Sequence, residues 1–342
     1  MPGQPLSRWR LPDWERHLDG LRSRGHDRVW LLLNGYTLGY PSAAYPGLRD
    51  PEAEAVRNPG LVPAIVAAAH GRGLKALAVF ATDGHAVGLA AAHPELKSVN
   101  RDGSPVSDDA VCLEEPAVGA YLNTLFVEAW NLCQDWDGVV LHPTEASPLR
   151  FNAVTRDQYR AETGRDLMAE SDETVLLWCN QQYAHAVTGW FKRWEGFRPG
   201  GDLVMFNCRW TNASVATYRD LLPPRARVGV WDYDWRGTDW RTRPLVGWTA
   251  AFGPERITYM PSGGGYPEDG RPPGEAPLRG YRRLFALAAY LRVPEVVFFA
   301  GWGTGGEAHE RVDRTLLDEW DSRATPIAAD LDAFDREEAG RG

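Results

Sequence analysis

The sequence predicts an α/β fold in which parallel strands alternate with helices and close into a (β/α)8 barrel. Short apolar runs that end in polar or aromatic residues alternate with longer amphipathic segments along the chain. This rhythm favours one parallel sheet with right-handed crossovers. No glycine-rich G-x-G-x-x-G turn follows a predicted strand, which argues against an open, doubly wound sheet. The 342 residues also suit a barrel, which typically takes about 250 residues plus insertions.

The composition narrows the class of protein. Apolar residues make up 44% of the chain and charged residues 24%, the mixture of a globular protein. The net charge of -9 and the absence of a Lys/Arg-rich block argue against a nucleic acid partner. No signal peptide or membrane-length apolar stretch is found, so we expect a cytoplasmic protein with no membrane partner. Fifteen tryptophans favour a carbohydrate ligand, because indole rings stack on sugar rings. Four cysteines are scattered singly and are expected to be buried: Cys112, Cys133, Cys179 and Cys208.

Three strands and four helices are predicted in the first half of the chain. The first helix illustrates the evidence, because Trp14, Leu18 and Leu21 recur at helical spacing and Gly25 follows them. The strands are compact apolar runs that suit a buried parallel sheet. They lie at 28–33, 74–81 and 138–141, and the helices lie at 13–24, 61–69, 117–133 and 173–193.

The second half repeats the same unit. Four more apolar runs predict strands at 203–206, 228–231, 257–260 and 296–299, with helices at 278–291 and around 312–320. Seven strands are therefore clear, and closure requires an eighth. The only candidate is the short, poorly apolar segment 4–9, so the first strand is predicted to be abbreviated. Residues 1–342 are predicted to form a single barrel domain, in which 151–173 is a loop excursion after strand 4.

Polar chemistry gathers where strand 4 ends. The run 138–141 leads into His142, Pro143, Thr144 and Glu145, and the proline stops further strand pairing. In parallel α/β folds the active site lies at the carboxyl ends of the strands, so Glu145 is the first catalytic candidate. The alternative is that Glu145 is an ordinary loop carboxylate or the partner of a helix N-cap.

Several segments resemble the glycoside hydrolase-like (β/α)8 domains of the clan that includes family 20 hexosaminidases and family 67 α-glucuronidases. Residues 7–9 look like the start of the first βα unit. The segment HPE at 93–95, with NRDG at 100–103, resembles the third loop of those barrels, and 112–117 resembles the "C-x-x-x-P" start of the next helix. The likeness covers about residues 5–320.

The resemblance implies an acid at the end of strand 4, which falls on Glu145. Family 20 has an aspartate immediately before this glutamate, whereas this chain has Thr144. That departure puts the substrate-assisted mechanism on N-acetyl sugars in doubt. The family 67 arrangement, with base carboxylates on late strands, is similar to what Asp232 could supply.

Glycoside hydrolysis needs two carboxyl groups, one protonated and one ionised, about 5 to 5.5 Å apart for retention or ~6.5 to 9.5 Å apart for inversion. We expect Glu145 to be the acid and Asp232, directly after the strand 228–231, to be the base. Only one of Asp232 and Asp234 is expected to face the pocket. The ends of strands 4 and 6 should lie roughly 9 Å apart, which favours inversion. The alternative for Asp232 and Asp234 is a solvated turn.

The remaining candidates are expected to bind the sugar. Polar groups at the strand ends would bond hydroxyls, although Asp83 and His85 could instead cap the next segment. The aromatic rings would stack on the sugar, and the alternative for each is packing in the core. No cofactor and no metal site are predicted, and the oligomeric state is left open. The predicted substrate-binding residues are Asn34, Tyr36, Asp83, His85, His142, Asn207, Trp210, Asp234, Trp235, Tyr266 and Trp302.

Two other function classes stay open. Asp83, His85, His142 and Glu145 are plausible ligands for a divalent ion, as in metal-dependent sugar isomerases or lyases on the same barrel. Against this class, no H-x-H signature follows the first strand. A carbohydrate-binding barrel without catalysis would follow if no second carboxylate faced Glu145. The first prediction remains a glycoside hydrolase for a small soluble glycoside or oligosaccharide.

Overall fold

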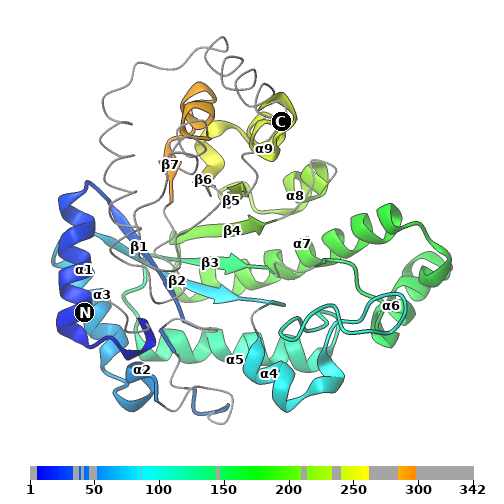
Figure 1. The fold of residues 1–342 in the computed structure, drawn as a ribbon, viewed down its shortest axis with the longest axis horizontal. Helices are drawn as coiled ribbons and strands as arrows, with labels where there is room; N and C mark the ends of the chain where they lie inside the picture. Colours follow the sequence, from blue (N-terminus) through cyan, green and yellow to red (C-terminus); the bar gives the residue numbers. More distant parts are fainter. Residues whose placement is uncertain are drawn as a thin grey trace, which may run out of the picture. The chain divides into compact units, whose positions relative to one another are not determined.

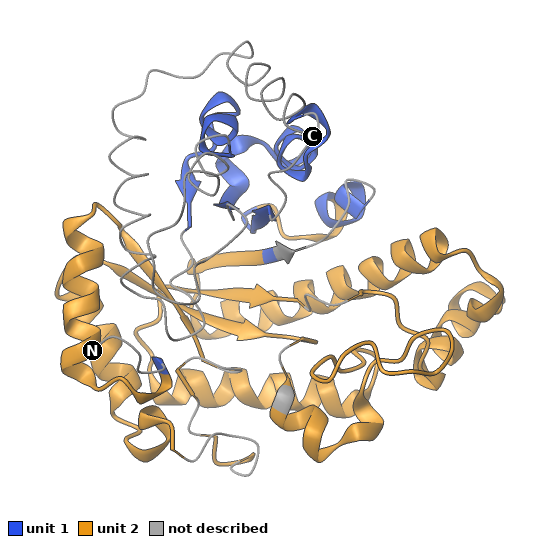
Figure 2. Ribbon diagram, viewed as in Figure 1, with its two compact units in different colours: residues 1–6, 206–219, 225–342 blue, residues 7–205, 220–224 orange. Residues whose placement is uncertain are grey.

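The structure is a computed structural model that describes residues 6–33, 38–39, 42–45, 52–84, 86–143, 147–208, 214–232, 240–261 and 284–297. It shows an α/β fold whose strands form a parallel sheet in the order β1-β2-β3-β4-β5-β6-β7. Two compact units are distinguished in Figure 2. We call residues 7–205 with 220–224 the N-terminal unit, and residues 1–6, 206–219 and 225–342 the C-terminal unit.

The elements of the first part of the chain follow the predicted alternation (Figure 1). The strands are β1 (Arg28–Leu32), β2 (Lys75–Ala81), β3 (Gly138–His142) and β4 (Asp202–Cys208). The helices are α1 (Leu11–Ser23), α2 (Glu54–Arg57), α3 (Leu61–His70), α4 (Val87–Ala92), α5 (Pro116–Leu132), α6 (Ala153–Thr163) and α7 (Asp172–Phe197).

The rest of the chain is shorter in described elements. They are α8 (Val215–Leu221), β5 (Arg227–Asp232), α9 (Pro244–Phe252), β6 (Ile257–Pro261) and β7 (Glu295–Val296), and residues 284–290 are helical. The pairs β5–β6 and β6–β7 are parallel, as are β1–β2, β2–β3 and β3–β4. Short 3-10 turns lie at Leu6–Arg8, Pro94–Leu96, Leu167–Ala169, Trp240–Thr242 and Pro254–Arg256.

Each of the seven predicted apolar runs overlaps a strand, the last one only at Val296, but two sequence predictions need correction. The expected first strand at 4–9 is wrong where it is described, because Leu6–Arg8 form a 3-10 turn. The segment 4–9 has two large apolar side chains, Leu6 and Trp9, and their spacing of three residues does not place them on one face of a strand. Sheet closure and an eighth strand are not found among the described residues. The excursion at 151–173 is not simply a loop, since it contains α6 and the turn Leu167–Ala169. The last predicted helix, around 312–320, lies outside the described residues.

Alternation along β2 shows which face of the sheet the helices cover. The ring of Phe80 packs edge-on against Phe126 of α5 and Trp194 of α7, with ring centroids 4.7 and 6.2 Å apart. Successive strand residues point to opposite faces, so Ala81 points away from these helices. Ala81 is paired with His142, so the side chain of His142 also lies on the face opposite α5 and α7. Figure 1 shows β2 and β3 pointing toward the side that carries α4 and α6.

Strand β3 runs close to β4 because it begins with glycine. A Cβ atom on Gly138 would collide with the backbone of Asp202, with which it is paired. All five residues of β3 are buried, as expected for a strand covered on both faces of a parallel sheet. Within the part of the chain that the structure describes, no helix is long and apolar enough to cross a membrane.

Candidate active site

Three of the predicted site residues have described side chains: Asp83, His142 and Asp232. Asn207 is the second-last residue of β4, and only its backbone is described. The other predicted residues fall outside the described residues, and their places stay predictions. They are Asn34, Tyr36, His85, Glu145, Trp210, Asp234, Trp235, Tyr266 and Trp302.

His142 is the last residue of β3, and its backbone and ring are held by hydrogen bonds to neighbouring residues. Its carbonyl oxygen accepts a hydrogen bond from the Thr82 amide at 2.8 Å, and the Thr82 hydroxyl lies 3.0 Å away. Its Nδ1 lies 2.8 Å from the carbonyl oxygen of Pro143. Because a carbonyl only accepts, we assign a proton to Nδ1, which leaves Nε2 as the nitrogen that would contact a hydroxyl.

Asp83 follows β2 and is buried in a polar network. Its side chain is 3% exposed, one carboxylate oxygen lies 3.0 Å from the Thr82 hydroxyl, and the other lies 3.9 Å from Nη1 of Arg150. The Thr82 hydroxyl also lies 3.0 Å from the hydroxyl of Tyr183 on α7. Helix α4, which follows, has Ala86 at its N-cap and no side-chain capping bond. Asp83 therefore does not cap α4, and its carboxylate lies near the Thr82 hydroxyl and the Arg150 guanidinium.

Sequence reasoning missed the strongest ion pair of this region, between Arg150 and Glu114. Nε and Nη2 of Arg150 donate to the two carboxylate oxygens of Glu114 at 2.9 and 2.7 Å. Nη1 donates to the carbonyl of Pro148 at 3.2 Å, and Nη2 also donates to that of Cys179 at 3.3 Å. Thr155 adds a hydroxyl donor to Glu114 at 3.1 Å. Every nitrogen of the guanidinium is thus bonded.

The charges of this cluster depend on one another. Burial by itself would raise the pKa of Glu114, but the guanidinium of Arg150 outweighs it and lowers that pKa. Burial would likewise lower the pKa of Arg150, yet Glu114 holds it well above its ordinary value. Burial, together with the charge of Glu114, raises the pKa of the Cys112 thiol to about 12. Glu114 and Arg150 are therefore a charged pair, whereas Cys112 stays a neutral thiol.

Asp232 is the last residue of β5 and lies in a second buried pair. Its side chain is 3% exposed, and one carboxylate oxygen accepts a hydrogen bond from Nη1 of Arg243 at 2.8 Å. The other oxygen accepts one from the Tyr259 hydroxyl at 3.2 Å. Burial raises the pKa of Tyr259 well above its ordinary value, and the neighbouring charge of Asp232 adds to the shift. Tyr259 therefore remains a neutral donor to a carboxylate.

The face on which Asp232 lies follows from strand register. Val230 is paired with Tyr259, and Asp232 lies two residues beyond Val230 on the same strand. The side chains of Asp232 and Tyr259 therefore lie on the same face of the sheet. Trp231 lies on the other face, where its ring centroid is 5.4 Å from that of Phe206. A Cβ atom on Gly229 would also meet the Phe206 ring, in agreement with this assignment. Asp232 is thus grouped with Arg243 and Tyr259.

The metal-ligand alternative concerns four residues, of which two are described. Among the described residues, no group of three or more His, Cys, Asp or Glu side chains is placed to hold a metal ion. Asp83 and His142 belong to adjacent strand ends, while His85 and Glu145 lie outside the described residues. The test of this alternative is therefore biochemical.

No protein family matches the sequence, and no curated protein matches it. Its fold resembles solved glycoside hydrolases. One is the α-L-fucosidase isoenzyme 2 from Paenibacillus thiaminolyticus, with a TM-score of 0.64 and 13% identity over 94% of this chain and 47% of that one. A second is the β-galactosidase from the Antarctic haloarchaeon Halorubrum lacusprofundi, with a TM-score of 0.66 and 11% identity over 93% and 57%.

A third similar structure is the β-N-acetylhexosaminidase from Bacteroides fragilis, with a TM-score of 0.54 and 13% identity over 90% of this chain and 63% of the enzyme. The chain thus spans between 47% and 63% of the length of these three structures. At such low identities the likeness shows the fold alone. The resemblance expected from the sequence is confirmed at that level, and no individual family is singled out.

Proposed function

We propose that this chain is a glycoside hydrolase that cleaves a small soluble glycoside or oligosaccharide with a pair of carboxyl groups. The observation that carries the proposal is the buried carboxylate of Asp232 at the carboxyl end of β5, held by Arg243 and Tyr259. Carboxyl ends of parallel strands are where barrel enzymes build their active sites. The fold shared with three glycosidases supports the same class of reaction. We further propose that residues 1–342 form one catalytic domain that acts in the cytoplasm.

The two carboxyl groups are assigned different roles. Glu145, three residues after the end of β3, would protonate the leaving oxygen of the glycosidic bond. Asp232 would activate a water molecule, which requires its ionised form. A charge-assisted bond from Arg243 favours that form. The predicted spacing of roughly 9 Å between the two strand ends supports an inverting mechanism.

The first experiment is a screen of aryl glycosides and oligosaccharides with the wild type, Glu145→Gln and Asp232→Asn. We expect turnover of at least one substrate, with loss of about 10²-fold or more in each variant. Glu173→Gln is the matched control, since it neutralises an exposed carboxylate in the first turn of α7. Unchanged turnover in Glu145→Gln would remove Glu145 from the mechanism. Sugar binding without turnover would instead identify a carbohydrate-binding barrel.

Two further measurements separate the remaining alternatives. Turnover that is lost with a chelator and restored by a divalent ion would replace the hydrolase with a metal-dependent isomerase or lyase. Proton NMR of the first-formed product reports its anomeric configuration. We expect inversion, and a retained configuration would direct the search to a nucleophile closer to Glu145.

A further inference from the structure

We infer that Nε and Nη2 of Arg243 bind a carboxylate of the ligand, which makes the substrate a carboxylate-bearing sugar. The inference rests on the proposed function, because it places this contact beside Asp232 at the carboxyl end of β5. It deepens that function by naming the class of sugar that the same site would take. The evidence is the hydrogen bonding of two buried arginines, Arg243 and Arg150.

The start of α9 places Arg243 beside Asp232. Arg243 is the N-cap residue of this helix. Its amide donates to the carbonyl of Trp240 at 3.3 Å, and its carbonyl accepts a hydrogen bond from the amide of Val246 at 3.0 Å. Its side chain is 2% exposed, and Nη1 donates to Asp232 at 2.8 Å. The residue is therefore held both at its backbone and at one nitrogen of its guanidinium.

The remaining two nitrogens of this guanidinium are buried donors. Nε and Nη2 have no hydrogen-bond acceptor in the part of the chain that the structure describes. In a planar guanidinium the N–H bonds of Nε and Nη2 run parallel and form the edge opposite Nη1. Since Nη1 is directed at Asp232, this edge faces away from that carboxylate. We call it the unpaired edge of Arg243.

Arg150 shows what the same edge binds elsewhere in this chain. Its Nε and Nη2 donate to the two carboxylate oxygens of Glu114 at 2.9 and 2.7 Å. Its Nη1 lies 3.9 Å from a carboxylate oxygen of Asp83, much as Nη1 of Arg243 lies beside Asp232. One buried guanidinium can thus hold a carboxylate on its Nε–Nη2 edge while a second carboxylate lies near Nη1.

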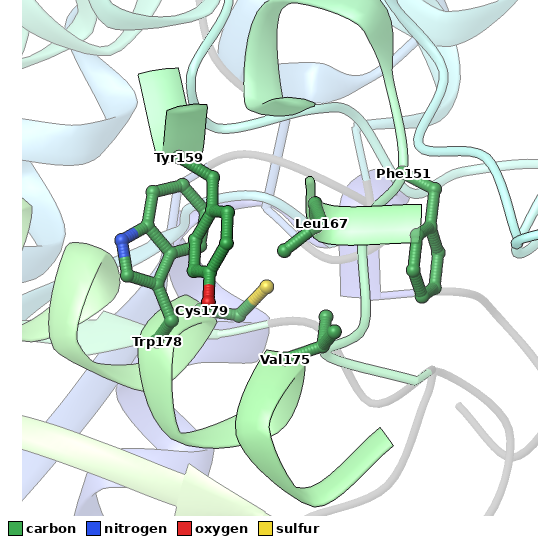
Figure 3. Packing of buried hydrophobic residues seen from close by; sticks show 6 residues of the cluster. All are labelled: Phe151, Tyr159, Leu167, Val175, Trp178 and Cys179. Atoms are coloured by element: carbon green, nitrogen blue, oxygen red, sulfur yellow. The ribbon is translucent and has the colours of Figure 1, made fainter. Parts of the chain in front are cut away.

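The edge of Arg150 is filled by the protein itself. Its Nη2 also donates to the carbonyl of Cys179 at 3.3 Å, and the side chain of Cys179 belongs to a small hydrophobic core. Figure 3 shows this core, whose members are Phe151, Tyr159, Leu167, Val175, Trp178 and Cys179. Arg150 is therefore bonded to internal partners beside a packed core. Among the described residues, the unpaired edge of Arg243 has no such partner.

A carboxylate matches the unpaired edge in shape and in charge. Its two oxygens accept both parallel N–H bonds, and such charge-assisted bonds are roughly twice as strong as neutral ones. The first turn of α9 contains no acidic residue, so the partial positive charge of this helix end also favours an anion. The guanidinium would lie between the bound carboxylate and Asp232, so each anion would face the cation.

The test compares sugars that differ only in the group at C6, using the full chain. Calorimetry gives the Kd of D-glucuronate and D-glucose, of D-galacturonate and D-galactose, and of D-mannuronate and D-mannose. We expect at least one uronate to bind about 10- to 100-fold more tightly than its neutral partner, which is the strength of charge-assisted hydrogen bonds. Contacts to hydroxyl groups alone would give equal binding within each pair.

Arg243→Lys is the decisive variant. It keeps a cation for Asp232 but removes the two-nitrogen edge, so we expect the preference for the uronate to disappear. Tyr259→Phe is one control, since it removes the bond to the other oxygen of Asp232 and leaves the edge intact. Arg241→Gln is the second, because it removes the positive charge of an exposed residue in the same segment. Both controls should retain the preference of the wild type.

Three results would overturn the inference. They are equal or weaker binding of all three uronates by the wild type, a preference that survives in Arg243→Lys, and a preference that Arg241→Gln removes as completely as Arg243→Lys. If Arg243→Lys does not fold, thermal unfolding of the wild type decides without a variant. A uronate that binds the folded protein more tightly raises Tm more than its neutral partner does, and equal shifts overturn the inference.

This test is independent of catalysis, because free sugars bind without cleavage of a bond. A uronate preference in a protein that turns over no glycoside would overturn the hydrolase and leave the ligand class standing. Turnover of neutral glycosides without any uronate preference would do the reverse. The two failures are therefore distinguishable.

Discussion

The N-terminal and C-terminal units each contain a buried arginine–carboxylate pair, and the two pairs differ in how completely they are bonded. Arg150 and Arg243 are both 2% exposed, and their partners Glu114 and Asp232 are both 3% exposed. Arg150 uses all three of its nitrogens. Arg243 bonds Asp232 through Nη1, but its Nε and Nη2 are buried without a hydrogen-bond acceptor among the described residues. Burial is therefore the same in both pairs, whereas the number of hydrogen bonds that the arginine makes to described residues differs.

This difference indicates different roles. A fully bonded buried network rigidifies the structure around it, whereas each unsatisfied buried donor costs about 1 to 3 kcal/mol. Proteins keep such costly groups mainly where function requires them. The Glu114–Arg150 pair is thus suited to anchoring two excursions of the N-terminal unit. The Asp232–Arg243 pair is suited to holding a reactive carboxylate, in agreement with the role proposed for Asp232.

Arg150→Met should give the largest loss of stability. It leaves Glu114 buried without its cation, and breaking a buried pair in this way costs about 3 to 5 kcal/mol. The measurement is the free energy of unfolding in urea at pH 7. The control is Arg101→Met, which removes a half-buried guanidinium and should cost clearly less. Equal losses of stability in the two variants would contradict a special contribution of the Glu114–Arg150 pair.

Glu114→Gln should cost somewhat less, about 1.5 to 3 kcal/mol at pH 7, and its cost should depend on pH. The pKa of Glu114 is lowered in the folded protein from its ordinary value of 4.5. The stabilisation is therefore fully present above pH 4.5 and is lost as the pH falls through the folded pKa. Urea unfolding between neutral and acidic pH should show the gap between wild type and variant narrowing below 4.5. A constant gap would contradict a charged pair.

Arg243→Met should cost less than about 2 kcal/mol, because removing two buried donors that have no acceptor among the described residues offsets part of the lost pair. Activity on the substrate found by screening should nevertheless fall strongly, since Asp232 loses the cation that holds it. The two readouts are urea unfolding and the acidic limb of the pH–rate profile, which should move to higher pH. A stability loss as large as that of Arg150→Met would contradict the expected difference in stability between the two pairs.

Tyr259→Phe should have the smallest effect, about 0.5 to 1.5 kcal/mol. It removes one neutral donor at 3.2 Å from Asp232 and leaves the arginine in place. Thermal or urea unfolding gives the cost, and the double variant with Arg243→Met tests whether the two donors act on the same carboxylate. Additive losses would mean that they do not.

The seven strands were predictable because the evidence for a strand is local. Apolar runs at 28–33 and 74–81, for example, contain β1 and β2 within a residue or two. Helix α6 was missed although its signals are present, since Gly164 ends it with a positive φ and Asn152 stands at its N-cap. Only two of its residues, Thr155 and Tyr159, are buried, so the apolar periodicity that identifies a helix is weak.

By itself the sequence determined the alternation of strands and helices, and the parity that separates Trp231 from Asp232 on β5. Both are properties of consecutive residues, and a backbone with a period of two or 3.6 residues converts them directly into faces. Only the tertiary structure decided which charges meet. Glu114 and Arg150 are 36 residues apart, and their pairing depends on how two excursions pack over the ends of β2 and β3. Charged side chains pair according to their distance in the folded protein, and the number of residues between them in the sequence does not give that distance.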